Sequence, residues 1–137
     1  MTGHWILKTE PSTYSFADLS RAKSAVWDGV KNAVALKNLA KMGKGDRLLV
    51  YHTGDEKAIV GRATVVRAAY PDPKAGDPRL VVVDIAAEDA LANPVTLAAI
   101  RAEPLFADLA LVRMPRLSVV ACSEAQYRRL VAMGEER

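Results

Sequence analysis

The chain has 137 residues, half of them hydrophobic and about a quarter charged, which is typical of one globular domain. Its single cysteine excludes an intramolecular disulfide, and no Cys/His spacing indicates a metal site. The net charge of +3 does not by itself indicate nucleic-acid binding, although basic residues outnumber acidic ones in the N-terminal third. No apolar run approaches the ~20 residues that span a membrane, and the N-terminus lacks a signal-peptide pattern, so we expect a cytoplasmic protein.

In chain order, short strands and helices alternate irregularly in the first part of the sequence. Residues 5–8 form a predicted strand, and Ser15 is the predicted N-cap of a helix that runs through residue 22. The apolar run 25–27 ends at an Asp-Gly break. Residues 32–42 then form a predicted amphipathic helix that ends at a glycine. Polar and aromatic residues lie beside each of these turns.

The middle of the chain is predicted to form a sheet. Strands are expected at residues 47–53, 58–69 and 79–87, where β-branched residues are frequent. Gly61 marks a β-bulge or a close backbone approach. The Pro/Gly-rich segment 71–78 lies between two predicted strands, so we expect a long hairpin loop there and not a linker between domains.

Two helices and one strand are predicted in the last third of the chain. Thr96 is the expected cap of a short helix through residue 102, residues 117–121 form a last strand, and Ser123 with Gln126 makes a capping box for a final helix. Strands and helices do not alternate regularly, which disfavours a parallel nucleotide-binding sheet. A small mixed barrel with helices packed around it fits this order of elements better.

Sequence signatures of common enzymes are absent. The chain has no phosphate-binding loop and no GxGxxG, GxSxG or HExxH motif. This absence lowers the expectation of a common hydrolase, kinase or dehydrogenase.

Two sets of candidate residues lie in the N-terminal part of the chain. Glu10, at the end of the first strand, accepts hydrogen bonds from a base edge or pairs with Lys8 or a backbone amide. Trp27, followed by an Asp-Gly turn, offers a stacking face worth about 1–3 kcal/mol to a nucleic-acid base. The structural alternative is that Trp27 belongs to the core, and that Asp28 and Asn32 only shape the turn and cap the helix.

A third set lies at the end of the strand 47–53. Strand alternation sends the side chains of Tyr51 and His52 to opposite faces, so only one of them can face a given pocket. His52 is the best general-base candidate of the sequence, although a lone histidine is more often a hydrogen-bonded structural residue.

A fourth set surrounds a proline just before the last strand. Arg113 and Arg116 are suited to phosphate because arginine can donate two parallel hydrogen bonds to one phosphate group. The structural alternative is that they form ion pairs with Asp108 or Glu103.

Together these four sets resemble the EVE domain, a member of the PUA-like group. The matching stretches cover nearly the whole chain and occur in the family's order: WILKTEPSTYSFADL, VWDGVKN, GDRLLVYHTGDEKAIVG, AYPDP, PVTLAAI and LVRMPRLSV. The resemblance implies one EVE domain over residues 1–137. It also implies an α+β fold, namely a PUA-like mixed β-barrel of five or six strands with short helices packed around it.

The resemblance also implies a pocket for a modified base of DNA or RNA. The family's motifs place in this pocket Trp5, Lys8, Thr9, Glu10, Trp27, Asp28, Gly29, Val30, Asn32, Tyr51, His52 and Thr53. The phosphate contacts that we expect are Lys31, Arg113, Pro115 and Arg116. The chain departs from the family's pattern at Thr53, where serine is usual, at Phe16, where tryptophan is frequent, and at Met114, where glutamine is common.

Our main hypothesis is a non-catalytic module that recognises a modified base, such as a modified cytosine, by flipping it into a pocket bordered by Trp27 and Tyr51. Its partner is DNA or RNA, and we expect a monomer without a cofactor, a bound metal or membrane contact. One alternative is a hydrolase or glycosylase that uses Glu10 or Asp28 as acid or base with help from His52. The other is a small-metabolite or protein-interaction module.

Overall fold

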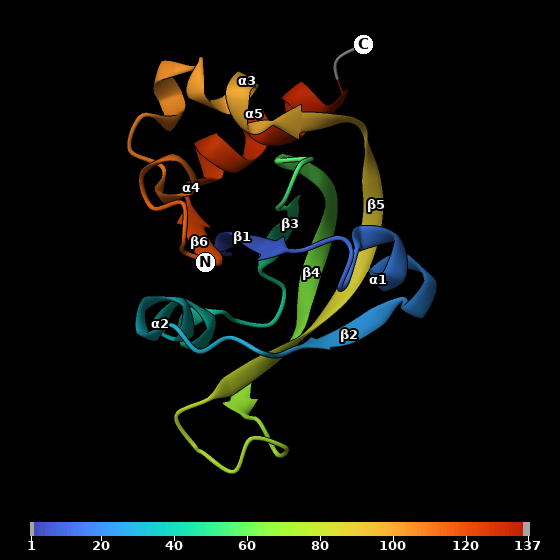
Figure 1. Cartoon of the computed structure of the whole chain (residues 1–137), viewed down its shortest axis with the longest axis vertical. Helices are drawn as coiled ribbons and strands as arrows, with labels where there is room; N and C mark the ends of the chain where they lie inside the picture. The colour runs from blue at the N-terminus through green and yellow to red at the C-terminus, as the bar shows by residue number, and fades with distance from the viewer. Residues whose placement is uncertain (1, 136–137) are drawn as a thin grey trace.

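One mixed sheet of six strands carries the fold within residues 2–135, the part of the chain that this computed structural model describes (Figure 1). Its strands, in chain order, are β1 (His4–Thr9), β2 (Ser24–Trp27), β3 (Arg47–His52), β4 (Ala58–Pro71), β5 (Val81–Thr96) and β6 (Val119–Cys122). The order across the sheet is β2-β5-β4-β3-β1-β6, in which β1 and β3 are parallel and the other neighbours are antiparallel.

Within residues 2–135, five α-helices and one 3-10 turn lie between or after these strands. They are α1 (Phe16–Ala22), α2 (Ala33–Lys41), α3 (Leu97–Arg101), the 3-10 turn Pro104–Phe106, α4 (Ala110–Arg113) and α5 (Glu124–Glu135). Figure 1 shows α3, α4 and α5 gathered at one end of the molecule, and the hairpin loop between β4 and β5 at the opposite end. None of the helices in the described part of the chain is long and apolar enough to cross a membrane.

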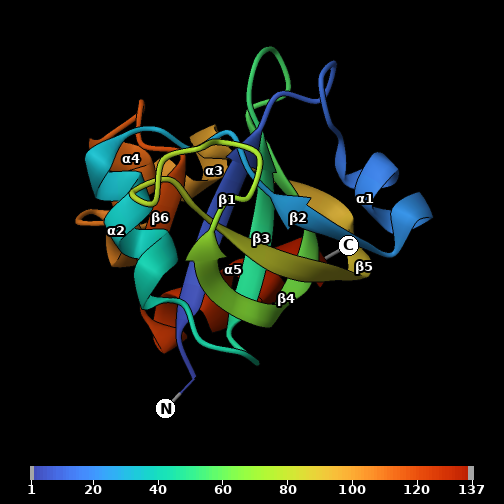
Figure 2. The same ribbon diagram turned by 90° about the horizontal axis from the view of Figure 1, so that it is seen from below.

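The sheet is open, so the predicted closure into a barrel is wrong, whereas the α+β class and the upper number of strands are confirmed. Its two edge strands, β2 and β6, do not pair with each other. Helix α2 packs against β6 and also against β4 and β5, and it lies beside β6 in Figure 2. The side-chain amide of Asn38 on α2 donates a hydrogen bond of 2.8 Å to the carbonyl of Val119 in β6. A side chain of helix α2 therefore bonds a backbone carbonyl of the edge strand β6. In a closed barrel, a neighbouring strand would make such a bond.

The two longest strands, β4 and β5, bend through several register shifts. One shift lies at Gly61, as expected for a β-bulge. A side chain at this position would also meet the ring of Phe16 at 2.4 Å, so the predicted close approach is present as well. Strand β5 runs to Thr96, well past the predicted end at residue 87. Around Pro94, β5 pairs with β4 on one side only, because its pairing with β2 ends before this point. Proline has no backbone N–H to donate, and a strand that is paired on one side only tolerates this lack.

The predicted helix caps are present. Ser15 and Asp18 form a reciprocal capping box at α1, with bonds of 2.9 and 3.1 Å, and Ser123 and Gln126 form another at α5, with two bonds of 3.0 Å. Thr96 accepts a hydrogen bond of 3.1 Å from the amide of Ala99 at the start of α3. These local contacts fix where three of the helices begin.

The central strands are buried on both faces. Consecutive residues such as Ile6 and Leu7 in β1, or Leu48 and Leu49 in β3, are fully buried. The carboxylate of Asp46 ties the beginnings of these two strands together, because it accepts hydrogen bonds of 2.9 Å from the amides of Gly3 and Gly43 and from the indole of Trp5.

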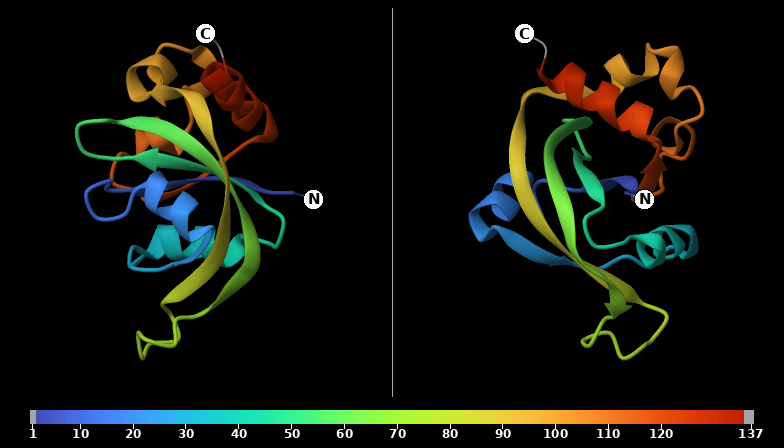
Figure 3. Two further views of the ribbon diagram at one scale, coloured as in Figure 1. Left: turned by 90° about the vertical axis from the view of Figure 1, so that its right-hand side faces the viewer. Right: turned by 180° about the vertical axis from the view of Figure 1, so that it is seen from behind.

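The parallel pairing of β1 and β3 brings the C-terminal ends of both strands to the same edge of the sheet. The loop after β1 (residues 10–15) and the loop after β3 (residues 53–57) project to the same side of the molecule (Figures 2 and 3). They touch through the Thr53 hydroxyl, which donates a hydrogen bond of 3.3 Å to the Glu10 carboxylate. Most of the predicted site residues lie at this edge.

Candidate nucleic-acid interface

A hollow of about 650 Å³ opens between the end of β1, the loop that follows it and the end of β2. We call it the Trp27 hollow. Its lining contains Lys8, Thr9, Glu10, Thr13, Tyr14, Ala25, Val26, Trp27, Asp28, Gly29, Val30 and Ser118. The structure thus brings together the predicted residues of the first two sets, apart from Trp5 and Asn32.

Trp27 and Tyr14 form the aromatic part of this hollow. Their rings meet edge to face, with centroids 6.3 Å apart and planes inclined by 75°. Trp27 is only 8% exposed, yet its indole N–H has no hydrogen-bond partner among the described residues. Because every fully buried side-chain nitrogen or oxygen in this part of the chain has a partner, the indole N–H is accessible from outside. Buried tryptophans usually satisfy this donor within the protein, so Trp27 offers a donor to a ligand.

Local hydrogen bonds hold Tyr14 in place. The Thr9 hydroxyl donates a hydrogen bond of 2.6 Å to the carbonyl of Tyr14, and the amide of Tyr14 donates one of 2.9 Å to the carbonyl of Glu10. On the other side of the hollow, Gly29 turns the chain with a φ of +77°, in the left-handed region that favours glycine. Sequence reasoning did not select Tyr14, and its only signal was its place inside the first matching stretch.

Lys8 supplies the positive charge of the Trp27 hollow. Its ammonium donates a hydrogen bond of 2.9 Å to the carbonyl of Pro115 and lies 5.7 Å from the centre of the Tyr51 ring. Burial lowers the pKa of Lys8. An ammonium group has three donors, so Lys8 keeps further hydrogen-bonding capacity after its bond to Pro115.

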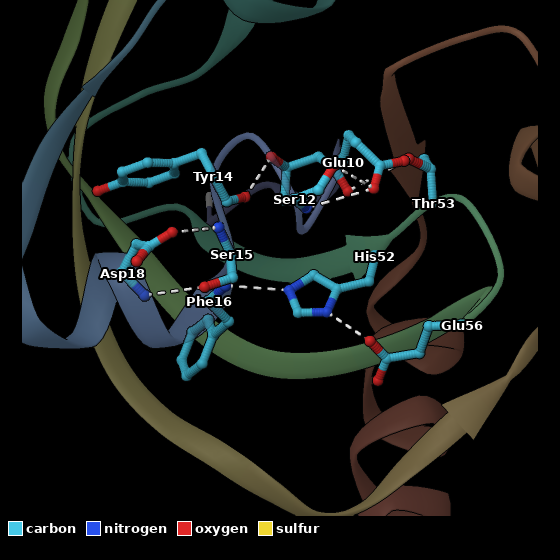
Figure 4. Close-up of polar contacts among 10 residues, drawn as sticks. Glu10, Ser12, Tyr14, Ser15, Phe16, Asp18, His52, Thr53 and Glu56 are labelled. Atoms are coloured by element: carbon cyan, nitrogen blue, oxygen red, sulfur yellow. Dashed lines mark hydrogen bonds and ion pairs between the residues drawn. The ribbon is translucent and has the colours of Figure 1, made fainter.

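The carboxylate of Glu10 accepts hydrogen bonds from its own loop and from the loop after β3 (Figure 4). It accepts hydrogen bonds of 3.3 and 3.1 Å from the amide and hydroxyl of Ser12, in addition to the bond from Thr53. The hydrogen bonds from Ser12 are the main cause that lowers the pKa of Glu10. Glu10 is therefore ionised near neutral pH and acts there as a hydrogen-bond acceptor.

His52 connects β3 to the start of α1. It lines neither the Trp27 hollow nor the second hollow, which contains Tyr51 and is described below. Its Nε2 accepts a hydrogen bond of 3.0 Å from the amide of Phe16, so the ring proton lies on Nδ1, which donates to the Glu56 carboxylate at 2.7 Å (Figure 4). Both ring nitrogens thus have structural partners. In residues 2–135, His, Cys, Asp and Glu side chains form no group of three that could hold a metal ion.

A second hollow of about 240 Å³ lies beside the first, and we call it the Arg101 hollow. Its lining contains Lys8, Tyr51, Thr53, Gly54, Lys57, Leu97, Arg101, Leu111 and Pro115. The expected single pocket bordered by Trp27 and Tyr51 is therefore divided into two hollows that share Lys8. A hydrogen bond also joins their linings, because Thr53 of the Arg101 hollow donates to Glu10 of the Trp27 hollow.

Besides His52, two further residues predicted for the base pocket, Trp5 and Asn32, lie outside both hollows. Trp5 is buried at the opposite end of β1, where it donates to Asp46. The amide oxygen of Asn32 accepts hydrogen bonds of 2.9 and 3.1 Å from the amides of Val34 and Ala35, and so caps α2. For both residues the structure supports a structural role.

Three of the predicted phosphate contacts, Lys31, Arg113 and Arg116, are exposed cations. The fourth, Pro115, lines the Arg101 hollow and accepts the hydrogen bond from Lys8. Arg113 donates a hydrogen bond of 2.9 Å to the carbonyl of Ala107, and Arg116 is exposed. The alternative ion pairs are not formed, because Glu103 pairs with Arg129 at 2.7 Å and Asp108 accepts a hydrogen bond from Gln126. Lys31 lines a third hollow, of about 590 Å³, between α2 and the β4–β5 loop.

Comparisons with known proteins place this geometry in a family. The family model described as EVE domain matches residues 3–133. A protein of Rhodopseudomonas palustris solved by NMR is 40% identical, with a TM-score of 0.91 over 97% of this chain and 93% of that one. The human THYN1 protein, solved in complex with DNA that contains 5-methylcytosine, is 24% identical, with a TM-score of 0.88 over 99% of both chains, which shows the same fold.

Among curated proteins, human thymocyte nuclear protein 1 is 32% identical over 84 residues, which are 53% of this chain and 37% of the human protein. The chain thus matches little more than a third of that relative's length. The expected PUA-like arrangement is supported by these structural neighbours, apart from its closure. With the family match extending over nearly all of its residues, the chain belongs to the EVE domain family.

Proposed function

We propose that this chain recognises a modified cytosine in DNA, without catalysing a reaction, by accepting the flipped base in the Trp27 hollow. One observation carries the proposal: the hollow has an aromatic floor whose indole N–H has no partner within the described residues. The hollow's volume of about 650 Å³ lies in the range of small-ligand sites. The human THYN1 structure with 5-methylcytosine DNA supports the choice of ligand.

The shape of the aromatic part suits one base. Because Trp27 and Tyr14 meet at 75°, they form two sides of a corner and not two parallel plates. A flipped base can stack on one ring while its edge contacts the other. The apolar side chains of Ala25, Val26 and Val30 line the same hollow and suit a methyl group at carbon 5 of cytosine.

The polar groups suit the pairing edge of cytosine, which presents one amino donor and two acceptors. Asp28 is exposed and forms no hydrogen bond or ion pair with any residue from 2 to 135, so its carboxylate is free to accept from the amino group. The ammonium of Lys8 and the indole N–H of Trp27 supply the donors. Glu10 already accepts three hydrogen bonds, so we assign it a supporting role in the loop.

The engaged state of Glu10 and His52 supports binding over catalysis. A general acid needs a pKa near the working pH, but the pKa of Glu10 is lowered. The two nitrogens of His52 are bonded to Phe16 and Glu56, away from the hollow. These contacts favour the reader over the hydrolase or glycosylase.

The test is fluorescence anisotropy with two DNA duplexes that differ only by one methyl group, cytosine against 5-methylcytosine. Val26 lines the hollow and is 49% exposed, so Val26→Trp fills the hollow without disturbing the core. Val66→Trp is the matched control, since Val66 is a strand valine that is 41% exposed and lies outside the hollow.

We expect the unsubstituted chain and Val66→Trp to prefer the methylated duplex, and Val26→Trp to lose this preference. A preference that survives in Val26→Trp would place the base elsewhere. Equal binding of both duplexes by the unsubstituted chain, weakened by salt, would reduce the proposal to a basic surface.

A further inference from the structure

Three positively charged side chains line the Arg101 hollow. Lys8, Lys57 and Arg101 line it together, and none of its lining residues is acidic. Neither Lys57 nor Arg101 forms an ion pair within the part of the chain that the structure describes. Three cations around a space of about 240 Å³ repel one another, and an anion between them removes this repulsion.

The same hollow is lined by Tyr51, whose hydroxyl group is a further candidate donor. Tyr51 is only 4% exposed, but its hydroxyl has no hydrogen-bond partner among residues 2–135. Since no fully buried side-chain oxygen in this region lacks a partner, the Tyr51 hydroxyl must be accessible, and the hollow that it lines provides the access. Burial raises the pKa of Tyr51, with the charge of Arg101 opposing it, so the hydroxyl keeps its proton and can donate.

The loop between β3 and β4 holds these donors in a fixed place. Gly54 adopts a φ of +76°, and a side chain there would meet the Glu10 carboxylate at 2.9 Å. Lys57 has a φ of +46°, which is costly for a residue with a side chain. Its carbonyl accepts a hydrogen bond of 2.8 Å from Leu97 at the start of α3, the helix that ends with Arg101. Strained residues of this kind often belong to binding sites.

Carboxylates do lie near the Arg101 hollow. That of Glu10 accepts hydrogen bonds from Thr53 in the lining and from Ser12 in its own loop. Asp55 and Glu56 line a neighbouring depression that shares Lys57, Leu97 and Arg101. Glu56 is already bonded to His52, and Asp55 forms no ion pair with a described cation. Arg101 and Lys57 therefore remain available to an external anion.

We infer that the Arg101 hollow binds the DNA phosphate next to the flipped nucleotide, with Arg101, Lys57 and the Tyr51 hydroxyl as its donors. The inference rests on the proposed function, because the Trp27 hollow must receive the base. Lys8 lines both hollows, so one nucleotide spans them with its base on one side of Lys8 and its phosphate on the other. The site then recognises a nucleotide within a strand, and not a free base.

A cycle of paired changes in protein and DNA tests this inference. Methylated duplexes are made in which a neutral methylphosphonate replaces the phosphate 5′ or 3′ to the 5-methylcytosine. Their binding is measured with the unsubstituted chain, with Arg101→Ala and with Tyr51→Phe, which removes only the hydroxyl. Lys44→Ala is the control, because Lys44 is exposed, forms no ion pair within the described chain and lies before β3, whereas Tyr51 lies near its end.

We expect one of the two methylphosphonates to weaken binding by the unsubstituted chain and by Lys44→Ala about tenfold. The same replacement is expected to cost almost nothing in Arg101→Ala, since the contact is already lost, and to cost less in Tyr51→Phe. All variants are expected to keep the preference for 5-methylcytosine over cytosine.

If each methylphosphonate weakened binding equally in the unsubstituted chain and in Arg101→Ala, the inference would be overturned. If the preference for 5-methylcytosine were retained in that case, the proposed base pocket would still stand. Loss of the methyl preference in the unsubstituted chain would instead contradict the proposed function. Inorganic phosphate is titrated against chloride at equal ionic strength. Saturable binding that Arg101→Ala abolishes, without coupling to either DNA phosphate, would reassign the hollow to a free anion.

Discussion

Asp46 gives the clearest prediction about stability, because one buried carboxylate joins the beginnings of β1 and β3. One of its oxygens accepts from the amide of Gly3, and the other accepts from the amide of Gly43 and the indole of Trp5. In Asp46→Asn, one of the two oxygens becomes an amide nitrogen, which cannot accept. At least one N–H donor then faces another donor, and the remaining bonds lose the charge that strengthens them.

The expected loss follows from these three bonds. A hydrogen bond to a charged group contributes about 1.5–3 kcal/mol and a neutral one about 1 kcal/mol. Losing one charged bond and weakening the others lowers the free energy of unfolding by about 3 kcal/mol. In a small domain this corresponds to a fall in Tm of roughly 10 °C.

The effect must also depend on pH. Burial raises the pKa of Asp46, but the hydrogen bonds from Gly43, Trp5 and Gly3 outweigh burial and hold the pKa below its ordinary value. A carboxyl whose pKa is lower in the folded state stabilises the protein above its unfolded pKa of about 4, and this contribution is lost as the pH falls through the folded pKa.

Urea denaturation of the unsubstituted chain and of Asp46→Asn, from about pH 7 to about pH 3, measures both effects. The difference in free energy of unfolding is expected to be largest near neutrality and to shrink below about pH 4. Asp55→Asn is the control, because Asp55 is exposed and without an ion pair among the described residues. A difference under about 1 kcal/mol at neutral pH, or one that does not change with pH, would refute the role given to Asp46.

Three further changes test the packing and the assignment of the site. Gly61→Ala is expected to destabilise the fold by about 1–3 kcal/mol in urea denaturation, because its methyl group would meet the Phe16 ring at 2.4 Å. Adding Phe16→Leu should recover part of this loss, and no recovery would contradict the proposed contact. His52→Ala is expected to lower stability by about 1–3 kcal/mol without changing the methyl preference in anisotropy, because it leaves the amide of Phe16 unpaired outside the hollow. If folded His52→Ala lost the preference for 5-methylcytosine over cytosine, His52 would belong to the base-binding site. Asp28→Ala should reduce the discrimination of 5-methylcytosine against thymine by about 1–3 kcal/mol, since thymine has no amino group to donate. Unchanged discrimination, measured with duplexes that differ at one position, would exclude Asp28 as the acceptor.

What could be predicted from the sequence is mostly local. The capping box of Ser123 with Gln126 joins residues three positions apart, and its two hydrogen bonds form within one turn of the chain. Gly61 was recognisable because a glycine inside a strand has few explanations. The openness of the sheet was not predictable in this way, because it concerns which distant elements meet at the edge, as where Asn38 bonds Val119, 81 residues away.

The two hollows likewise contain contacts between residues that lie far apart in the sequence. Lys8 reaches the carbonyl of Pro115 across 107 residues, and Thr53 reaches Glu10 across 43. No spacing pattern in the sequence encodes either contact. Tyr14 was missed because the hydrogen bonds of its loop, and not a strand or helix period, bring it against Trp27.

The two tryptophans show why burial alone cannot distinguish a binding residue from a core residue. Trp5 and Trp27 are both 8% exposed. The indole of Trp5 donates to Asp46, which leaves it nothing to offer a ligand, whereas the indole of Trp27 has no partner in the described chain. A protein that only needed a large apolar side chain at the end of β2 would gain from a leucine or phenylalanine, because neither carries an N–H that must be satisfied. The unpaired donor of Trp27 is therefore better explained by a ligand that accepts a hydrogen bond in the hollow than by packing.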